Sequence, residues 1–442
     1  MGRMLPLFNR KEVRTYISRS WSVSWPMTLI MFFEFLIGLT DVYIAGKISK
    51  EVQAAYGFVI QLYFIFIVVA NALTVGTVSV VSKLYTSGDK EELDKTIFSS
   101  MVIAAFFGII LATAGILFTA DMISFLNIPP ELKHFGIPLA KIYAGGLIFH
   151  YILIHSNGVL RSCNMVKISL KTMALVCAIN IGLNFFYVFY TPLHFKGIAL
   201  ATATSVLIGS MVNLMFVRRA MTERKGFFMN PIKKIVHIGW PIGMLQVTWQ
   251  LASMVLFLIL SALPKNNVEI LAALTTGLRI ESVIYLPAFA LNMANAVIIG
   301  NLLGKKKKEE AFRSGMVTAS IGVMIVMIMV VIVILNARWI ASFLTNNEMV
   351  IQESVRYIYI SMISEPFMAW GLILGGGLNG AGDTRSVLMR VGLSVWLVRI
   401  PLSLIFVVVL GFGAGSVWWS MNLSQFVQAF LISKRYLDRR WL

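Results

Sequence analysis

The sequence is poor in charge and in cysteine. Asp, Glu, Lys and Arg make up 13% of its 442 residues, whereas soluble domains carry roughly 25%. Because the charge is so scarce, most of the chain must lie in lipid or in protein interior. Only two cysteines occur, Cys163 and Cys177, both in apolar or near-membrane stretches, so that no disulfide framework is implied.

The scarce charges leave long runs that contain no Asp, Glu, Lys or Arg at all. A helix needs roughly 20 apolar residues to cross the hydrocarbon core of a bilayer, and each run is long enough. The runs are Val52–Ser82, Ile97–Ala120, Ile235–Pro264, Ser282–Gly304, Ser314–Ala337 and Ile400–Ser433. With further breaks at Gly, Pro and Asn clusters, the pattern predicts an all-α integral membrane protein with twelve transmembrane helices. The predicted helices are residues 21–45, 53–82, 97–119, 139–159, 169–190, 197–217, 236–263, 270–302, 314–337, 354–378, 387–410 and 413–433.

Positive charge is abundant, with a net charge of +18, and in a soluble protein this would suggest a nucleic-acid partner. Here most of the 38 lysines and arginines fall in alternate loops, which the positive-inside rule places in the cytoplasm. We therefore expect a multi-pass protein of the plasma (inner) membrane with both termini cytoplasmic. The basic clusters Arg218–Lys234 and Lys305–Lys308 then lie at the lipid surface, and no nucleic acid is expected to bind.

Two halves of the chain repeat each other at one offset. Lys90-Glu91-Glu92 recurs as Lys308-Glu309-Glu310, and Ser124-Phe125-Leu126 recurs as Ser342-Phe343-Leu344, both after 218 residues. Since chance matches would scatter, the common offset indicates a duplication. We predict an N-terminal lobe of six helices at 1–218, a basic cytoplasmic connector at 219–235 and a C-terminal lobe of six helices at 236–442. An even number of helices per lobe makes the repeats parallel, with a cleft between the lobes.

Ionisable and amide side chains inside the predicted helices are the candidates for function, because buried charge in a bilayer is costly. Glu34 and Asp41 lie seven residues apart on one face of the first helix. Asn180 and Asn184 share a face of the fifth helix, with Tyr187 on the same stripe, and Thr202 lies in the sixth. A carboxylate, two amides and a hydroxyl suit a hard cation such as sodium, and a desolvated carboxylate also accepts a proton. Asn and Thr in membrane helices also join neighbouring helices by hydrogen bonds with no further role.

Several short motifs indicate a resemblance to a known protein family. Pro26 is followed fifteen residues later by Asp41, with Gly46 beyond it, Gly88-Asp89 follows the second helix and Gly304 the eighth. The segment Gly377–Arg385, which follows the tenth helix and reads GLNGAGDTR, is the most diagnostic. Through these motifs the chain resembles the multidrug and toxic compound extrusion (MATE) family, within the superfamily of oligosaccharide-lipid flippases. The resemblance implies that Asp41, Asn180, Asn184 and Thr202 form a cation or proton site.

The chain also departs from one branch of that family. Trp249 and Met368 stand where that branch has acidic residues, although Glu365 lies one turn away. A sodium site in the C-terminal lobe is therefore not expected, and the resemblance is to the DinF-like branch. Glu281 lies two residues from Arg279, so these two side chains point to different sides and serve either as tethers or as cleft lining. Lining of the cleft is predicted for Glu34, Tyr187, Glu281 and Glu365.

Together these features predict an antiporter coupled to H⁺ or Na⁺ that exports cationic or amphipathic organic compounds by alternating access. Its expected partners are a small organic substrate and membrane lipid, and a monomer is expected. No cofactor is expected besides the coupling ion, with sodium, if used, at the Asp41 site. An enzyme is not expected, since the sequence has no nucleophile–base pair, metal cluster or nucleotide-binding motif. The alternatives are a flippase for lipids or lipid-linked sugars, and a channel, which would need a charged pore ring.

Overall fold

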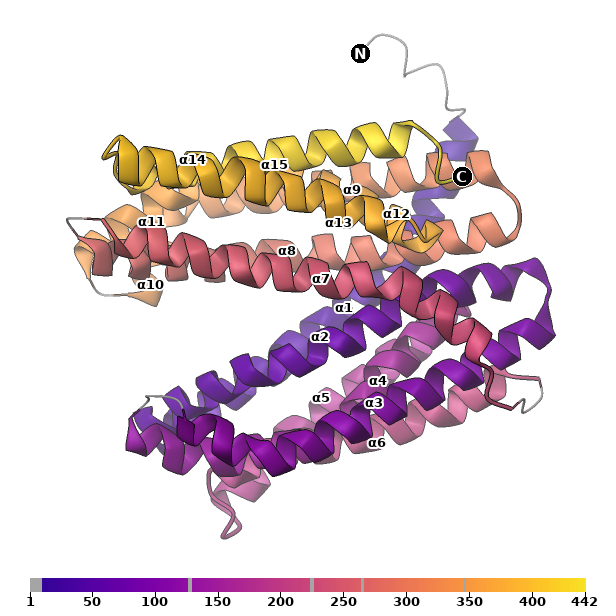
Figure 1. Ribbon diagram of the computed structural model, residues 1–442, viewed down its shortest axis with the longest axis horizontal. Helices are drawn as coiled ribbons and strands as arrows, with labels where there is room; N and C mark the ends of the chain where they lie inside the picture. Colours follow the sequence, from indigo (N-terminus) through magenta and orange to yellow (C-terminus); the bar gives the residue numbers. More distant parts are fainter. Residues whose placement is uncertain (1–9, 126–128, 223–225, 264–265, 346) are drawn as a thin grey trace. The chain divides into compact units, whose positions relative to one another are not determined.

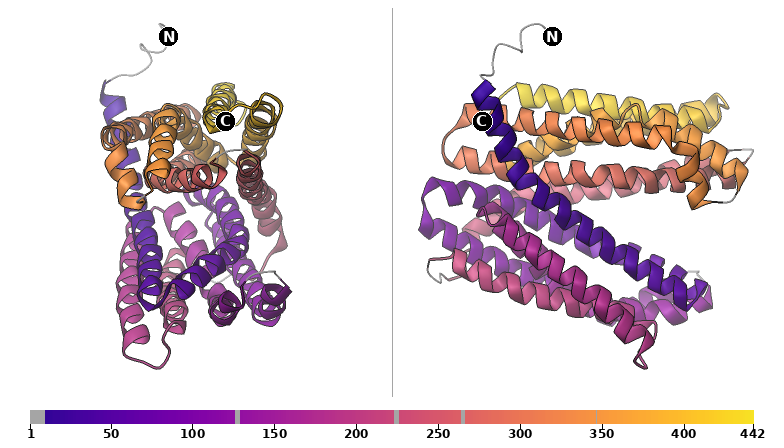
Figure 2. Two further views of the ribbon diagram at one scale, coloured as in Figure 1. Left: turned by 90° about the vertical axis from the view of Figure 1, so that its left-hand side faces the viewer. Right: turned by 180° about the vertical axis from the view of Figure 1, so that it is seen from behind.

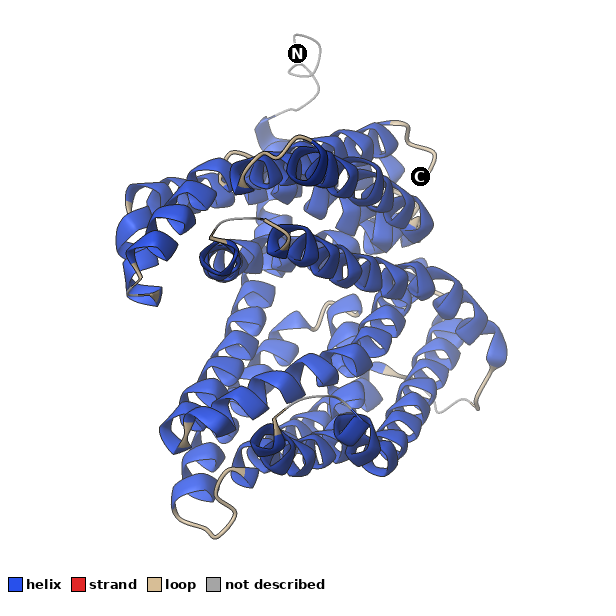
Figure 3. Cartoon of the chain, turned by 60° about the vertical axis from the view of Figure 1, so that its left-hand side comes forward, coloured by secondary structure: helices blue, strands red, loops and turns tan. Residues whose placement is uncertain are grey.

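The computed structural model describes residues 10–125, 129–222, 226–263, 266–345 and 347–442. Within these ranges all regular structure is helical and no strand occurs (Figure 3). In the same ranges ten helices are long and apolar enough to cross a membrane, and one bent pair of helices makes an eleventh. The predicted class, an all-α multi-pass membrane protein, is confirmed.

The helices follow one another along the chain with short connections (Figure 1). Each of the twelve predicted helices overlaps one or more of the observed helices. Most of the observed helices extend beyond the predicted ends. They are α1 (Arg10–Ile48), α2 (Lys50–Ser87), α3 (Lys90–Phe125), α4 (Pro130–Ser162), α5 (Val166–Phe189), α6 (Lys196–Ala220), α7 (Met229–Ser261), α8 (Asn267–Gly304), α9 (Lys308–Leu335), α10 (Ala337–Leu344), α11 (Glu348–Ser361), α12 (Glu365–Ala381), α13 (Thr384–Ser394), the π-helix η2 (Val395–Arg399), α14 (Ile400–Leu404), the π-helix η3 (Ile405–Val409) and α15 (Ala414–Leu437).

Two parts of the helical pattern differ from the prediction. The predicted helix 354–378 is broken into α11 and α12, whose axes differ by 56°. The short helix α10 was not predicted, because it is far too short to cross a bilayer. Its aromatic side chains Trp339 and Phe343 stack with centroids 6.2 Å apart and are largely exposed, as is typical of residues at a membrane–water interface.

The duplication is visible in the backbone as well as in the sequence. Gly88 has φ of 88° and Lys306 has φ of 59°, and these two positions are 218 residues apart. Asn164, with φ of 58°, and Gly382, with φ of 88°, are separated by the same offset. Left-handed residues end helices and are uncommon for side chains other than Gly and Asn, so their recurrence at one offset supports the predicted repeat.

The chain divides into two compact units. The C-terminal unit consists of Met1–Thr28 with Met244–Leu442, and the N-terminal unit consists of Leu29–Gly243. The division falls inside α1 and α7, two residues after Pro26 and two residues after Pro241. Helix α1 nevertheless runs without a break through its division point (Figure 2). The lobe limits predicted at 218 and 236 stay a prediction, and residues 1–9 and 223–225 of those segments lie outside the described residues.

In the N-terminal unit α4 is the central helix, and it packs against α2, α3 and α6. Small residues permit the close approach, as where Gly108 of α3 lies against Ile148 and Tyr151 of α4. Helix α5 packs against α6. The polar residues of α5 and α6 are thereby turned toward the interior of the unit.

In the C-terminal unit α8 packs along α12, and two glycines of α12 set the distance between them. A side chain at Gly376 would collide with the backbone of Asn292, and one at Gly380 would collide with the backbone of Ala296. Spacing of small residues by four is typical of close helix pairs in membranes. The glycine-rich sequence before Gly382 therefore serves helix packing.

We expect Gly380→Val to abolish most of the folded protein, because a Cβ atom there has no space without separation of α8 from α12. Inserting methylenes into a packed core costs about 1–3 kcal/mol even where only side chains must move. The yield of monodisperse protein and its thermal unfolding in detergent measure the effect. Gly392→Val is the matched control, since a Cβ atom there meets nothing within 4 Å, and equal stability of the two variants would contradict the packing argument.

Candidate functional site

Helices α1, α5 and α6 bring one acidic and three neutral polar side chains together inside the N-terminal unit. Asp41 lies on α1, Asn180 and Asn184 lie one turn apart on α5, and Thr202 lies on α6. Asp41 is 2% exposed and both asparagines are 0% exposed. A spacing of four residues puts both amides on one side of α5. The structure thus brings together all four residues that the sequence predicted as one site.

Hydrogen bonds join these side chains into a closed ring. Asn184 Nδ2 donates to Asp41 Oδ1 over 2.7 Å and to Asn180 Oδ1 over 3.1 Å. Asn180 Nδ2 donates to Thr202 Oγ1 over 3.1 Å, and Thr202 Oγ1 donates to Asp41 Oδ2 over 3.0 Å. Each carboxylate oxygen therefore receives a donor, which a buried ionised carboxylate needs.

Two tyrosines that the sequence analysis did not single out complete the surroundings of Asp41. Tyr56 of α2 and Tyr143 of α4 donate to Asp41 Oδ2 over 3.3 and 3.4 Å. Their rings meet edge to face with centroids 6.3 Å apart. A tyrosine buried in a helix needs a partner for its hydroxyl group. The sequence places Tyr56 in the charge-free run 52–82, but Tyr63 lies in the same run and bonds His150 instead.

Asp41 has no cationic neighbour to balance its charge among the described residues. The groups that act on it are Asn184, Thr202, Tyr56 and Tyr143, all neutral. A buried carboxylate in neutral surroundings is stabilised when a proton or a cation binds to it. Asn184 Oδ1 is buried and accepts no hydrogen bond, so it remains free as an oxygen ligand for a hard cation. The site can therefore change its charge by binding either a proton or a monovalent cation.

A narrow recess lies beside the ring in the N-terminal unit. It touches Thr202 of the ring and the neighbouring Tyr143, two of the three groups that donate to Asp41 Oδ2. The residues that line it are Tyr63, Tyr143, Gly146, Thr202, Ala203 and Val206. The recess has no room for a water molecule.

The remaining predicted residues lie outside the ring. Glu34, two turns before Asp41 on α1, is exposed and interacts electrostatically with Arg161. Tyr187 on α5 is half-buried, with its ring 5.8 Å from that of Phe186. Glu281 and Glu365 lie in the C-terminal unit and are buried there. Their predicted role as cleft lining stays a prediction.

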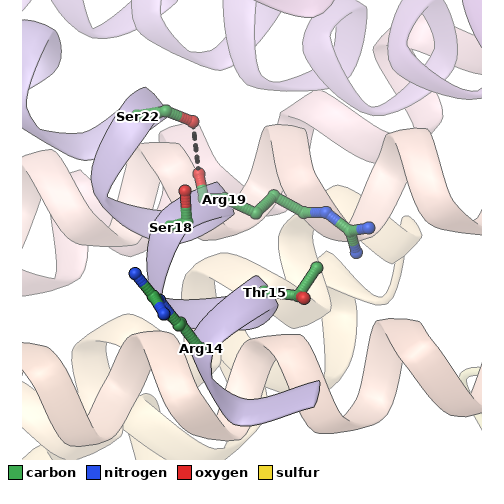
Figure 4. Close-up of a pocket in the computed structure, with 5 residues that line it drawn as sticks. All are labelled: Arg14, Thr15, Ser18, Arg19 and Ser22. Carbon is green, nitrogen blue, oxygen red and sulfur yellow. Dashed lines mark hydrogen bonds between the residues drawn. The ribbon is translucent and has the colours of Figure 1, made fainter. Parts of the chain in front are cut away.

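A shallow hollow on the amino-terminal part of α1 has a different character (Figure 4). Its lining consists of Arg14, Thr15, Ser18, Arg19 and Ser22. Ser22 Oγ donates to the carbonyl oxygen of Arg19 over 2.8 Å, and the Arg19 guanidinium forms an ion pair with Glu310 at 3.4 Å. Two guanidinium groups and no carboxylate line the hollow, which does not suit an organic cation.

Comparison with known proteins places these features in a family. The model of the MatE family matches residues 26–186 and 241–405. The first match begins at Pro26 and includes Asp41, Asn180 and Asn184, whereas Thr202 lies between the two matches. An uncharacterized transporter of Bacillus subtilis, YisQ, is 24% identical over 96% of this chain and 94% of its own length. A probable multidrug resistance protein, NorM of Thermotoga maritima, is 21% identical over 92% of this chain and 89% of its own length.

Solved structures of transporters share the fold over nearly the whole chain. A MOP superfamily transporter from Pyrococcus furiosus superposes with a TM-score of 0.89 at 20% identity, covering 95% of both chains. The MATE transporter VcmN of Vibrio cholerae, solved in a bent form, gives a TM-score of 0.89 at 17% identity, covering 97% of this chain and 98% of that one. At these identities the likeness concerns the fold, and it agrees with the twelve-helix arrangement predicted from the sequence.

Proposed function

Since the chain belongs to the MatE family and is therefore a membrane transporter, we propose that it is a cation-coupled antiporter that exports organic compounds. Relatives named as multidrug resistance proteins support an exporter of small organic molecules. We propose cationic or amphipathic compounds as its substrates. We also propose that it works as a monomer in the inner membrane with both termini in the cytoplasm, as the distribution of Lys and Arg favours.

One observation supports coupling to a cation more than any other: Asp41 is buried in a ring of neutral donors without a counter-charge. Binding of one cation from the outside cancels the charge of this carboxylate and removes the need for some of its donors. The side chains of the ring, which come from α1, α5 and α6, must then rearrange. We propose that this rearrangement favours release of the substrate to the outside, and that loss of the cation to the cytoplasm resets the transporter by alternating access.

We propose a proton as the coupling ion, and sodium as the alternative. The donors to Asp41 are one amide nitrogen, from Asn184, and three hydroxyl groups, from Thr202, Tyr56 and Tyr143. A proton can replace any of these donors on the carboxylate with little movement. Sodium requires oxygen ligands, so Asn184 would have to rotate its amide to present Oδ1 in place of Nδ2. The unpartnered Asn184 Oδ1 is the observation that keeps sodium as an alternative.

The test is uptake of a fluorescent organic cation into proteoliposomes with an acidic or a sodium-rich lumen. For molecules whose outer face is toward the lumen, we expect an acidic lumen to drive accumulation of the dye. Exchange of one proton per dye cation sustains up to about tenfold accumulation for about one pH unit, since that gradient is worth ~1.4 kcal/mol. If only a sodium gradient drives dye accumulation, sodium is the coupling ion. If neither gradient drives it, the result favours a flippase of the same superfamily.

A further inference from the structure

The amino-terminal part of α1 carries its polar side chains in two adjacent stripes. Arg14, Ser18 and Ser22 follow one another at a spacing of four residues and are exposed, and Thr15 and Arg19 form the stripe beside them (Figure 4). These five residues line the shallow hollow described above. Two guanidinium groups together with hydroxyl groups form a surface that favours an anion with several oxygen acceptors, such as a phosphate.

An exposed apolar stripe runs along the other side of the Arg14 stripe. Ile17 and Trp21 are four residues apart and are 44% and 53% exposed. Residues three apart are neighbours on a helix surface, so Ile17 lies beside Arg14 and Trp21 lies beside Ser18. The helix therefore presents apolar and phosphate-binding side chains next to each other, which matches the acyl chain and the headgroup of a phospholipid.

The level of this surface relative to the bilayer follows from the sequence. Trp21 is the first residue of the predicted membrane helix 21–45, and tryptophan is enriched at membrane–water interfaces. Arg14 lies seven residues before Trp21, which places it about 10 Å farther out along the helix axis. Arginine side chains at helix ends extend along the lipid surface to reach the headgroups. The surface thus lies at the depth of the lipid phosphates, on the side that the proposed topology makes cytoplasmic.

The carboxylates near this surface do not neutralise it. Glu310 forms an ion pair with Arg19 at 3.4 Å, but a shorter one with Lys307 at 2.7 Å. Glu12 forms an ion pair with an arginine of α9 at 3.1 Å. Among the described residues no carboxylate forms an ion pair with Arg14. The surface therefore keeps an excess of positive charge, and the Arg14 guanidinium is available to a ligand.

We propose that this surface binds an anionic phospholipid of the cytoplasmic leaflet. Arg14 and Arg19 bind the phosphate, the Ser18 hydroxyl donates a further hydrogen bond, and one acyl chain lies along Ile17 and Trp21. Guanidinium groups bind phosphate through pairs of parallel hydrogen bonds, and basic clusters next to membrane helices recognise anionic lipids. Binding of the lipid does not depend on the proposed antiport function, whereas the choice of leaflet rests on the proposed topology.

A lipid suits this surface better than a soluble phosphate does. The hollow is shallow and open, and exposed ion pairs in water contribute little because solvent and salt screen them. The apolar stripe adds to the affinity only if the ligand carries a hydrocarbon chain. A phospholipid uses both the basic and the apolar stripe, whereas a free anion uses the basic side chains alone.

Tryptophan quenching in proteoliposomes tests the site at the residue itself, because brominated acyl chains quench the tryptophans that they touch. The chain has ten tryptophans, so the Trp21 signal is taken as the difference between the parent protein and Trp21→Phe. We expect brominated phosphatidylglycerol to quench this signal at a severalfold lower mole fraction than brominated phosphatidylcholine does. Equal quenching by the two lipids in the parent protein would overturn the proposal.

Substitution of the two arginines is expected to remove the preference for the anionic lipid. In Arg14→Gln/Arg19→Gln both brominated lipids should quench Trp21 equally, and Arg14→Gln alone should lower the preference. Because these side chains lie at the surface, the variants are expected to unfold near the temperature of the parent protein. Full preference in the folded double variant would contradict the site. If the double variant fails to fold, Arg14→Gln decides, since no ion pair of the described residues is lost with it.

Glu310→Gln separates lipid binding from a structural role of the Arg19–Glu310 ion pair. This variant breaks the same ion pair as Arg19→Gln but keeps the guanidinium and removes a nearby negative charge. A lipid site therefore predicts that Glu310→Gln keeps or increases the preference for phosphatidylglycerol, while Arg19→Gln lowers it. Equal losses in the two variants would show that the ion pair, and not lipid binding, is at work. Arg338→Gln, which removes an exposed guanidinium paired with Glu348, is the control for net charge and should keep the preference.

Inorganic phosphate distinguishes a lipid site from a site for a soluble anion. We expect millimolar phosphate to leave the quenching by brominated phosphatidylglycerol as it is in chloride at the same ionic strength. Displacement of the lipid by phosphate but not by chloride would overturn the proposal in favour of a soluble phosphate ligand. None of these measurements requires transport, so a failed dye-uptake assay would leave their outcome untouched.

Discussion

Replacement of Asp41 by asparagine is expected to reduce ion-driven export to the level of empty vesicles while the protein still folds. The carboxylate is the one group of the ring that can change charge, because its partners Asn180, Asn184 and Thr202 are neutral at any physiological pH. A variant that cannot bind a cation at this position has nothing to couple to the pH gradient. Uptake of the fluorescent cation by proteoliposomes with an acidic lumen measures the loss.

The same variant is expected to remain folded. Asparagine has nearly the shape of aspartate, and its amide oxygen still accepts the hydrogen bond from Asn184, which is the shortest of the ring at 2.7 Å. The variant loses the charge-assisted part of that hydrogen bond. It also gains an amide NH₂ group that must find an acceptor, which costs about 1 kcal/mol. It also removes a buried charge that had no counter-ion. The two effects oppose each other, so thermal unfolding should change little.

Asp121→Asn is the matched control for Asp41→Asn. Asp121 lies in the last turns of α3 and is exposed, so its charge is solvated and its removal should leave export intact. Export by Asp41→Asn at the rate of this control would remove Asp41 from the mechanism. Loss of folded Asp41→Asn protein would show instead that the carboxylate is structural.

Asp41 and its two asparagine partners could be predicted from the sequence because charge is so rare in the chain. A single Asp inside an apolar helix is conspicuous, and two asparagines four residues apart identify one face of another helix. Tyr56 and Tyr143 could not be found in the same way. Tyrosine is common in membrane helices, chiefly near the interface, and only the packing of α2 and α4 shows that these hydroxyl groups point at Asp41.

The helix ends were predicted less well than the helices, and for a physical reason. The predicted limits were set at charged residues, since charge ends the apolar run. Helix α3, however, begins at Lys90, seven residues before its predicted start at 97, because charged residues are good helix formers once the chain leaves the lipid. Glu91 and Glu92 in its first turn also interact favourably with the helix dipole.

The break between α11 and α12 and the π-helix η2 could not be predicted from the sequence. Both depend on tertiary packing, which local propensity does not encode.

Asn184→Leu is expected to abolish ion-driven export, with rates at least about tenfold below the parent protein. Leucine has a similar volume but removes the donor to Asp41 Oδ1 and the bond to Asn180 Oδ1, so the ring opens at its shortest link. A hydrogen bond to a charged group contributes about 1.5–3 kcal/mol, and a loss of this size changes an equilibrium between two states more than tenfold. The dependence of dye uptake on luminal pH measures the change.

Asn213→Leu separates this effect from a general loss of stability. Asn213 is also 0% exposed and in the N-terminal unit, and its Nδ2 donates to Asn157 Oδ1 over 2.8 Å and to Ser156 Oγ over 3.1 Å. It therefore joins α6 to α4 as Asn184 joins α5 to α1, but no carboxylate takes part. Both variants are expected to unfold at lower temperature by similar amounts, whereas only Asn184→Leu should lose the response to pH. If the pH response survives equally in both, the asparagines of α5 join helices and have no part in coupling, and the ion must be bound by Asp41 without them.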